Sequence, residues 1–123
     1  MERIEEFTIN GRNFIYIDLS DLKASSDFLE FAEPISATIA KYPEQSVYAI
    51  TNIENMRFDS ESKDIITEYM KQNNPYVKYG VLIGIDGIKK IMALEVFKII
   101  GRTNMGFSFS KEHAIEWLLL QED

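Results

Sequence analysis

His113 is the only histidine in this chain of 123 residues, and histidine is the side chain whose usual pKa lies nearest neutral pH. A histidine acts as a general base when a nucleophile and an orienting carboxylate lie beside it. Lys111, Glu112 and Glu116 surround His113 in a segment with helical spacing, which is typical of a solvated surface position. The sequence therefore indicates no catalytic residue, and we expect the protein not to be an enzyme.

The remaining side chains give no sign of metal or cofactor chemistry. The absence of cysteine excludes thiolate ligands, disulfides and cysteine nucleophiles. The twenty acidic residues show neither the HExxH spacing of zinc peptidases nor the Asp-x-Asp-x-Asp-Gly spacing of calcium loops. The sequence predicts neither a metal site nor a cofactor.

One turn is a candidate binding site for an anion. The anion could be a phosphate or a carboxylate, for example that of a lipid headgroup. It ends the apolar run 79–85, which is short enough to be a buried strand, and opens a helical segment. Backbone N–H groups at a helix N-terminus attract anions. The candidate residues are Gly84, Gly87, Lys89, Lys90 and Arg102. Asp86 would repel an anion, so an ordinary strand-to-helix turn is the alternative.

Asp59 and Ser60 precede a segment in which Ile65, Ile66 and Tyr69 recur on one helical face. Aspartate and serine are both favourable N-cap residues, because their side-chain oxygens accept hydrogen bonds from the first free N–H groups of a helix. We therefore expect a helix to begin at one of these two residues.

The helical segment 88–100 carries apolar residues nearly all round. At about 100° per residue, one face holds Ile88, Met92, Val96 and Ile99, and we expect it to pack on the sheet. The other sides carry a candidate interaction patch, which consists of Ile91, Leu94 and Phe97. A twin subunit, another protein or a bound lipid could cover this patch. Alternatively, the last helix of the chain covers it.

Short strands and helices must position these residues. Segments 7–9 and 14–17 flank Asn10-Gly11, a dipeptide that tolerates the positive φ angles of a type I′ hairpin turn. A helix then follows the capping residues 25–27, and Pro34 either kinks this helix or marks the point where a second one begins.

Strands and helices alternate after the hairpin. We expect further strands at 47–50, 79–85 and 105–109, with helices between them and one after the last. A chain of this length fits one domain. The sequence therefore predicts a single α/β domain over residues 1–123, with a mostly parallel five-stranded sheet, an antiparallel N-terminal hairpin strand and about four helices.

The order of these elements resembles the SpoIIAA-like group of STAS domains from about residue 5 to residue 118. Four short motifs contribute to the resemblance: NPYVK at 74–78, GIDGIKKI at 84–91, the Gly101-Arg102 pair and EHAIEWL at 112–118. The resemblance implies a small non-enzymatic α/β domain, related to anti-sigma-factor antagonists and more distantly to CRAL-TRIO lipid-carrying domains.

The resemblance also implies a phosphorylation switch. In the antagonists, a serine directly after an aspartate, at the start of the helix after the third strand, is phosphorylated by a partner kinase. Ser60 takes that position here and Asp59 the position before it. The next positions depart from the motif of the antagonists, which have small residues and glycine there. This chain has Glu61, Ser62 and Lys63 instead. A helix cap is the alternative role of Asp59 and Ser60.

Charge and hydropathy limit the partners. A formal net charge of −7 argues against nucleic acid, which needs a basic face. No apolar run approaches the roughly 18 residues of a transmembrane segment. The charged first residues do not resemble a secretion signal, so a cytoplasmic location is the expectation.

Two functions remain open at this stage. The first is a regulatory module that binds a protein partner or a second copy of itself, as a homodimer, through the helix 88–100. The second is a carrier or sensor of a small apolar or lipid-like ligand, in keeping with the lipid-carrying relatives. Because 123 residues leave limited room for a cavity, the chain length favours the first function.

Overall fold

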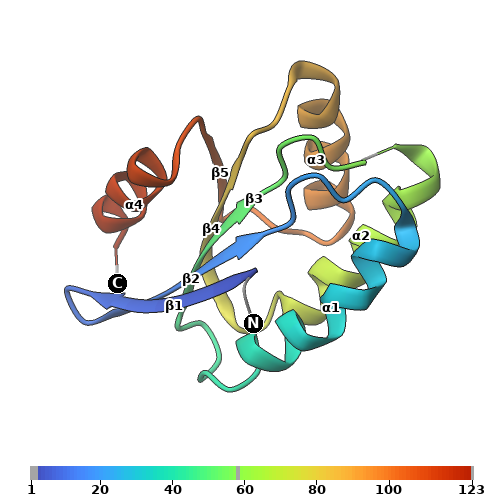
Figure 1. The fold of residues 1–123 in the computed structure, drawn as a ribbon. Coiled ribbons are helices and arrows are strands. Elements are labelled where there is room, and N and C mark those ends of the chain that lie inside the picture. Colours follow the sequence, from blue (N-terminus) through green and yellow to red (C-terminus); the bar gives the residue numbers. More distant parts are fainter. Residues whose placement is uncertain (1–2, 58, 123) are drawn as a thin grey trace.

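The computed structural model describes residues 3–57 and 59–122. These residues form a five-stranded sheet with the strands in sequence order (Figure 1). The first two strands, β1 (Ile4–Ile9) and β2 (Arg12–Asp18), are antiparallel. The remaining strands are β3 (Val47–Asn52), β4 (Val77–Ile83) and β5 (Met105–Ser108). Each pairs in parallel with the strand before it: β3 with β2, β4 with β3 and β5 with β4. The predicted fold class is confirmed.

Helices cover both faces of this sheet. One face carries α1 (Ser25–Ile39), α2 (Ser60–Asn73) and α3 (Gly87–Ile99), and the other carries α4 (Lys111–Leu120) (Figure 1). Crossovers between parallel strands have one hand, so strands added in sequence order place every connecting helix on the same face. Helix α4 follows the last strand and is free of that constraint.

The hairpin turn has the predicted conformation. Asn10 and Gly11 have φ angles of 52° and 76°, and the positive sign at both positions is that of a type I′ turn. This turn sets the register in which Phe7 lies opposite Phe14, and their rings stack with centroids 5.3 Å apart.

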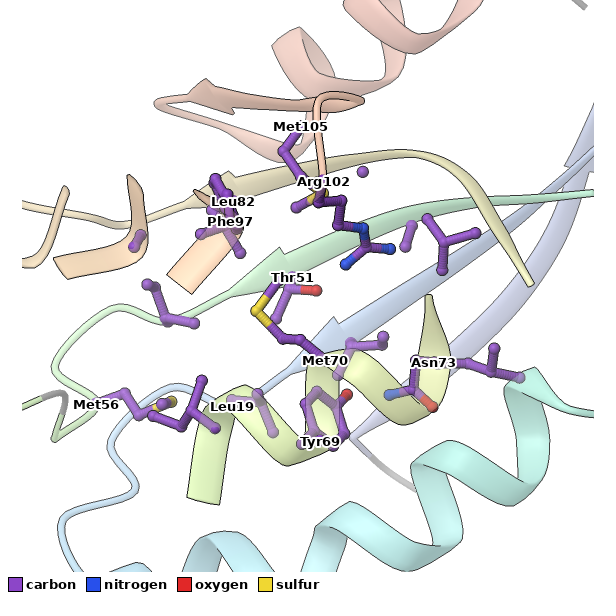
Figure 2. A pocket seen from close by; sticks show the side chains of 18 of the residues that line it. Leu19, Thr51, Met56, Tyr69, Met70, Asn73, Leu82, Phe97, Arg102 and Met105 are labelled. Carbon is purple, nitrogen blue, oxygen red and sulfur yellow. The ribbon is translucent and has the colours of Figure 1, made fainter. Parts of the chain in front are cut away.

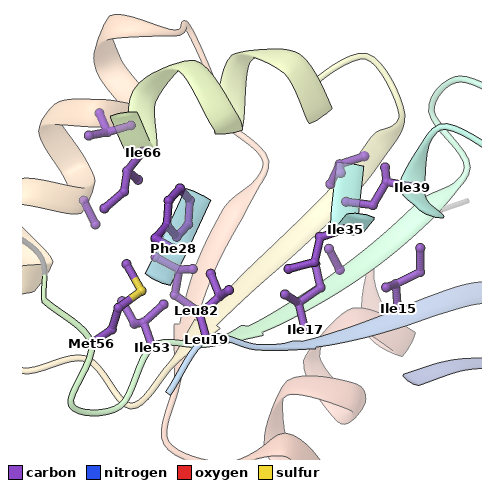
Figure 3. Packing of buried hydrophobic residues seen from close by; sticks show 14 of the residues in the cluster. Ile15, Ile17, Leu19, Phe28, Ile35, Ile39, Ile53, Met56, Ile66 and Leu82 are labelled. Carbon is purple, nitrogen blue, oxygen red and sulfur yellow. The ribbon is translucent and has the colours of Figure 1, made fainter. Parts of the chain in front are cut away.

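Two clusters of buried residues form the core, one on each face of the sheet. Successive residues of β2 point to opposite faces, so Ile15 and Ile17 join the cluster under α1–α3 while Phe14 joins the one under α4. Ile35 and Ile39 of α1 pack in the larger cluster (Figure 3). This larger cluster is the part of the fold that surrounds the site described below.

Helix α1 differs in detail from the expectation. It runs without a break through Pro34, so the alternative of a second helix beginning there is wrong. Pro34 has no N–H to donate to the carbonyl of Glu30, and both residues lie on the exposed side of the helix. The N-cap is Ala24, which makes no side-chain capping bond, and the expected capping role of residues 25–27 is therefore also wrong.

The expected inner face of helix α3 is only partly correct. Val96 is buried and Met92 packs against the core as expected, but Ile88 is 76% exposed and Ile99 is 59% exposed. Ala93 and Phe97 are buried in their place. A helix with apolar residues on every side has no single apolar stripe, so its spacing does not determine which side meets the core. Contacts with the sheet and with α2 decide that side.

Candidate functional site

A cavity of about 60 Å³ lies between the sheet and helices α2 and α3. Most of its walls are apolar, and they include Leu82 of β4 and Phe97 of α3. Besides Thr51 on β3, three polar side chains line it: Tyr69, Asn73 and Arg102. Figure 2 shows Arg102 extending into the cavity from the α3–β5 connection, with Tyr69 and Asn73 on α2 opposite. The cavity therefore has mostly apolar walls, and we call the part between Arg102 and the α2 side chains Tyr69 and Asn73 its polar end.

Local backbone geometry places these three side chains. Tyr69 and Asn73 are four residues apart on α2 and therefore share one face of that helix. Gly101 has a φ angle of +69°, and the Arg102 N–H donates to the Phe97 carbonyl at 2.8 Å. This Schellman turn ends α3 and turns the chain back toward the sheet, which directs Arg102 inward.

Each of these three side chains has a polar group that lacks a partner within the described residues. These groups are the Tyr69 hydroxyl, Asn73 Nδ2 and Arg102 Nε, and each is buried without a hydrogen bond. Burial lowers the pKa of Arg102 to about 10, so the guanidinium is still charged at neutral pH. Burial also raises the pKa of Tyr69 above its ordinary value, so its hydroxyl keeps its proton.

The glycine-rich turn after β4 is capped by a carboxylate of the chain itself. Gly84 has a φ angle of +75°, and α3 begins at Gly87. The Asp86 carboxylate caps this helix and accepts the Lys89 N–H at 3.0 Å, so a carboxylate of the chain itself occupies that donor. Lys90 lies over the Phe107 ring, 4.9 Å from its centroid. Anion binding at this turn remains a prediction.

Arg102 does not belong to that turn. Helix α3 leads from the carboxyl end of β4, where Gly84 lies, back to the amino end of β5, which Arg102 precedes. Thirteen helical residues rise about 20 Å, so the two ends of α3 lie far apart. The expectation that Arg102 assists the glycine-rich turn is therefore wrong.

Asp59 and Ser60 begin helix α2 as expected. The Asp59 carboxylate accepts the backbone N–H of Glu61 and of Ser62, and the Ser62 hydroxyl accepts the Asp59 N–H at 3.0 Å, which completes a capping box. Hydrogen bonding from Arg57, at 2.7 Å, lowers the pKa of Asp59. Ser60 is the first helical residue and is exposed. Its phosphorylation remains a prediction.

Two of the three residues of the predicted interaction patch on α3 are exposed. Ile91 and Leu94 are 66% and 50% exposed, but Phe97 is only 5% exposed and packs in the core, so it cannot belong to a surface patch. Exposed Ile88 and Ile99 extend the surface instead. We call the residues Ile88, Ile91, Leu94 and Ile99 the outer face of α3.

The last helix does not cover this surface. Trp117 and Leu118 of α4 belong to the cluster on the opposite side of the sheet from α3 (Figure 1). Trp117 packs edge-on against Tyr79, with ring centroids 6.4 Å apart. The alternative in which α4 shields the apolar residues of α3 is therefore wrong.

Other candidate chemistry is not assembled within residues 3–57 and 59–122. His113 is exposed in the first turn of α4, where its ring lies 4.1 Å from that of Phe109. No three His, Cys, Asp or Glu side chains in those ranges are grouped so that they could hold a metal ion. None of the helices formed by those residues combines the length and apolarity needed to cross a membrane.

Comparison with known proteins identifies the fold. The structure is similar to that of an anti-sigma-factor antagonist (STAS) domain protein from Planctomyces limnophilus, with a TM-score of 0.53 and 13% identity over 92% of this chain and 96% of that chain. No family model and no curated protein matches the sequence. The chain therefore has the STAS fold, as its motifs predicted, and identity this low shows the fold alone.

The polar end of the cavity is not predicted by the sequence. The spacing of residues places Arg102 near the glycine-rich turn, and it does not single out Tyr69 or Asn73 as site residues. One signal was present: Asn73 stands four and seven residues after Tyr69 and Ile66, on the otherwise apolar face of α2. A polar residue on a buried helical face is an indication of a partner or a ligand.

Proposed function

We propose that this protein is a non-enzymatic regulatory module that works by binding another protein chain through the outer face of α3. The observation that supports the proposal is the exposure of four large apolar side chains, between 50% and 76%, on one side of a single helix. Several large apolar side chains exposed together on one helix are typical of protein interaction sites. The STAS fold, shared with an anti-sigma-factor antagonist, also supports a regulatory role.

The charged neighbours of this surface suit a specific interface. Glu95 is held by an ion pair with Lys63 of α2 at 2.7 Å, which lowers the pKa of Glu95. Lys90 and Lys98 are exposed beside the apolar residues. Apolar side chains with a polar rim are the usual composition of a protein interface.

Sedimentation equilibrium over a range of concentrations tests the proposal with a second copy of the chain as the partner. We expect a dimer, and Leu94→Glu should weaken it by about tenfold or more because it places a charge in the apolar contact. Leu120→Glu is the matched control, since Leu120 is 83% exposed on α4, across the sheet.

Equal association of Leu94→Glu and the wild type would contradict this proposal, because it would exclude the outer face of α3 from the interface. A wild type that stays monomeric at every concentration would contradict self-association, and the partner would then be a different protein.

A second candidate function is the binding of a small apolar ligand, and the cavity beside Arg102 supports it. Its volume of about 60 Å³ exceeds the roughly 10–15 Å³ that one water molecule requires. A volume of this size suits a compact molecule better than a long lipid chain, so the carrier hypothesis narrows to small ligands.

A further inference from the structure

Arg102 places a positive charge beside the cavity, on a half-buried side chain whose Nε is fully buried. No carboxylate within the described parts of the chain pairs with its guanidinium, and the Tyr69 hydroxyl beside it stays neutral. A largely buried ion costs several kcal/mol in solvation unless an opposite charge or hydrogen bonds compensate it. The fold therefore leaves an unmet requirement for negative charge at the polar end of the cavity.

The unpartnered groups around Arg102 share one hydrogen-bonding character. Arg102 Nε is a donor, Asn73 Nδ2 is a donor, and the protonated Tyr69 hydroxyl can donate. A group that satisfies all three must therefore accept several hydrogen bonds at once. An ionised carboxylate offers two oxygens and about four acceptor sites, which matches this arrangement.

The charge and the walls of the cavity narrow the ligand further. Arg102 is the only charged residue among the described residues that line the cavity, so a monoanion balances the site and a phosphate dianion does not. The remaining walls are formed mostly by aliphatic, methionine and aromatic side chains, such as Leu82, Met70 and Phe97. Such walls favour a hydrocarbon tail over a polar one.

We propose that this cavity binds a small aliphatic monocarboxylate, with its carboxylate between Arg102, Tyr69 and Asn73 and its hydrocarbon tail against the apolar walls. The proposal deepens the second candidate function and does not depend on the outer face of α3 binding a protein.

The polar end of the cavity can adapt to such a ligand. Met70 and Met105 line it and are half-buried, and methionine side chains are unbranched and change rotamer easily. Gly80 makes room for Met105, since a Cβ on Gly80 would lie 2.6 Å from the Met105 sulfur. These residues can move without displacing the backbone of α2 or β4.

An NMR titration of the ¹⁵N-labelled chain with hexanoate tests the proposal, with butyrate as the shorter acid and hexanamide as the uncharged analogue. We expect hexanoate to shift the amide signals of residues that line the cavity. It should bind about tenfold or more tightly than hexanamide, because only the acid forms charge-assisted hydrogen bonds.

Two variants identify the contacts. Arg102→Met should weaken hexanoate binding by about tenfold or more and remove the preference for the acid over the amide. Tyr69→Phe, which removes only a hydroxyl, should cause a smaller loss. Leu94→Glu is the control on the outer face of α3, and it should bind hexanoate as the wild type does even where it abolishes self-association.

Three results would overturn the proposal. They are the absence of any shift with either acid, equal affinity for hexanoate and hexanamide, and unchanged hexanoate binding by a folded Arg102→Met variant. None of these results bears on the protein-binding role of α3, which sedimentation tests separately.

Discussion

Replacing Gly84 by alanine tests how the carboxyl ends of β3 and β4 are held together. Gly84 has a φ angle of +75°, a conformation that costs other residues about 1–2 kcal/mol. A Cβ at this position would also lie 2.7 Å from the Glu54 Cβ and 2.8 Å from the Glu54 backbone nitrogen. Relieving that overlap requires the β3–α2 loop to move, at about 1–3 kcal/mol. We therefore expect Gly84→Ala to lose about 2–5 kcal/mol of unfolding free energy.

Gly11→Ala is a matched control for the cost of the positive φ angle. Gly11 has a φ angle of +76°, but a Cβ there would meet no heavy atom within 4 Å. Urea denaturation of both variants should therefore show Gly84→Ala to be less stable than Gly11→Ala by about 1–3 kcal/mol, the part due to the overlap with Glu54. Equal losses in the two variants would refute the reasoning, since they would show that the loop moves freely.

Three further predictions concern the core, the cavity and the pH dependence. Phe97→Ala should lose about 3–5 kcal/mol of unfolding free energy in urea denaturation, while Leu94→Ala, one turn earlier but exposed, should stay within about 0.5 kcal/mol of the wild type. Arg102→Met should raise the ligand-free unfolding free energy by about 1 kcal/mol or more, because it removes an uncompensated buried charge; a fall would show that the guanidinium is stabilised by its surroundings. The Tyr42 hydroxyl donates to Glu6 at 2.6 Å, and this hydrogen bond raises the pKa of Tyr42 to about 12. Its contribution to stability is fully present below the unfolded tyrosine pKa of about 10 and is lost as the pH rises through the folded value, so Tyr42→Phe should flatten the alkaline part of the stability curve.

The parts of the fold that could be predicted are those that short-range chemistry decides. Asn10-Gly11 determined a hairpin turn because few other residues tolerate positive φ angles at both positions. Asp59 began α2 as expected because a carboxylate can satisfy the first free N–H groups of a helix without help from distant residues. The order of strands and helices followed from such local signals, and with them the STAS fold.

Tertiary contacts decided what could not be predicted. The side of α3 that meets the sheet depends on which neighbours are present, and its spacing allowed either Ile88 or Phe97 to face the core. The cavity depends on α2 and on the α3–β5 connection, which are distant in sequence. Arg102 carried no local sign that its charge would be buried, since the Schellman turn at Gly101 directs it inward only after α3 has docked.

Helix α3 contributes residues to both proposed binding sites, one on each side, so the two sites can be tested separately. Its inner side supplies Ala93 and Phe97 to the cavity, while its outer side carries Leu94. Adjacent residues of a helix point about 100° apart, so Ala93 and Leu94 can be changed independently. Leu94→Glu alters the surface without entering the cavity, and Arg102→Met alters the cavity without reaching the outer face. If both variants fold, the loss of protein binding in the first and of carboxylate binding in the second would assign two separate sites to one small domain.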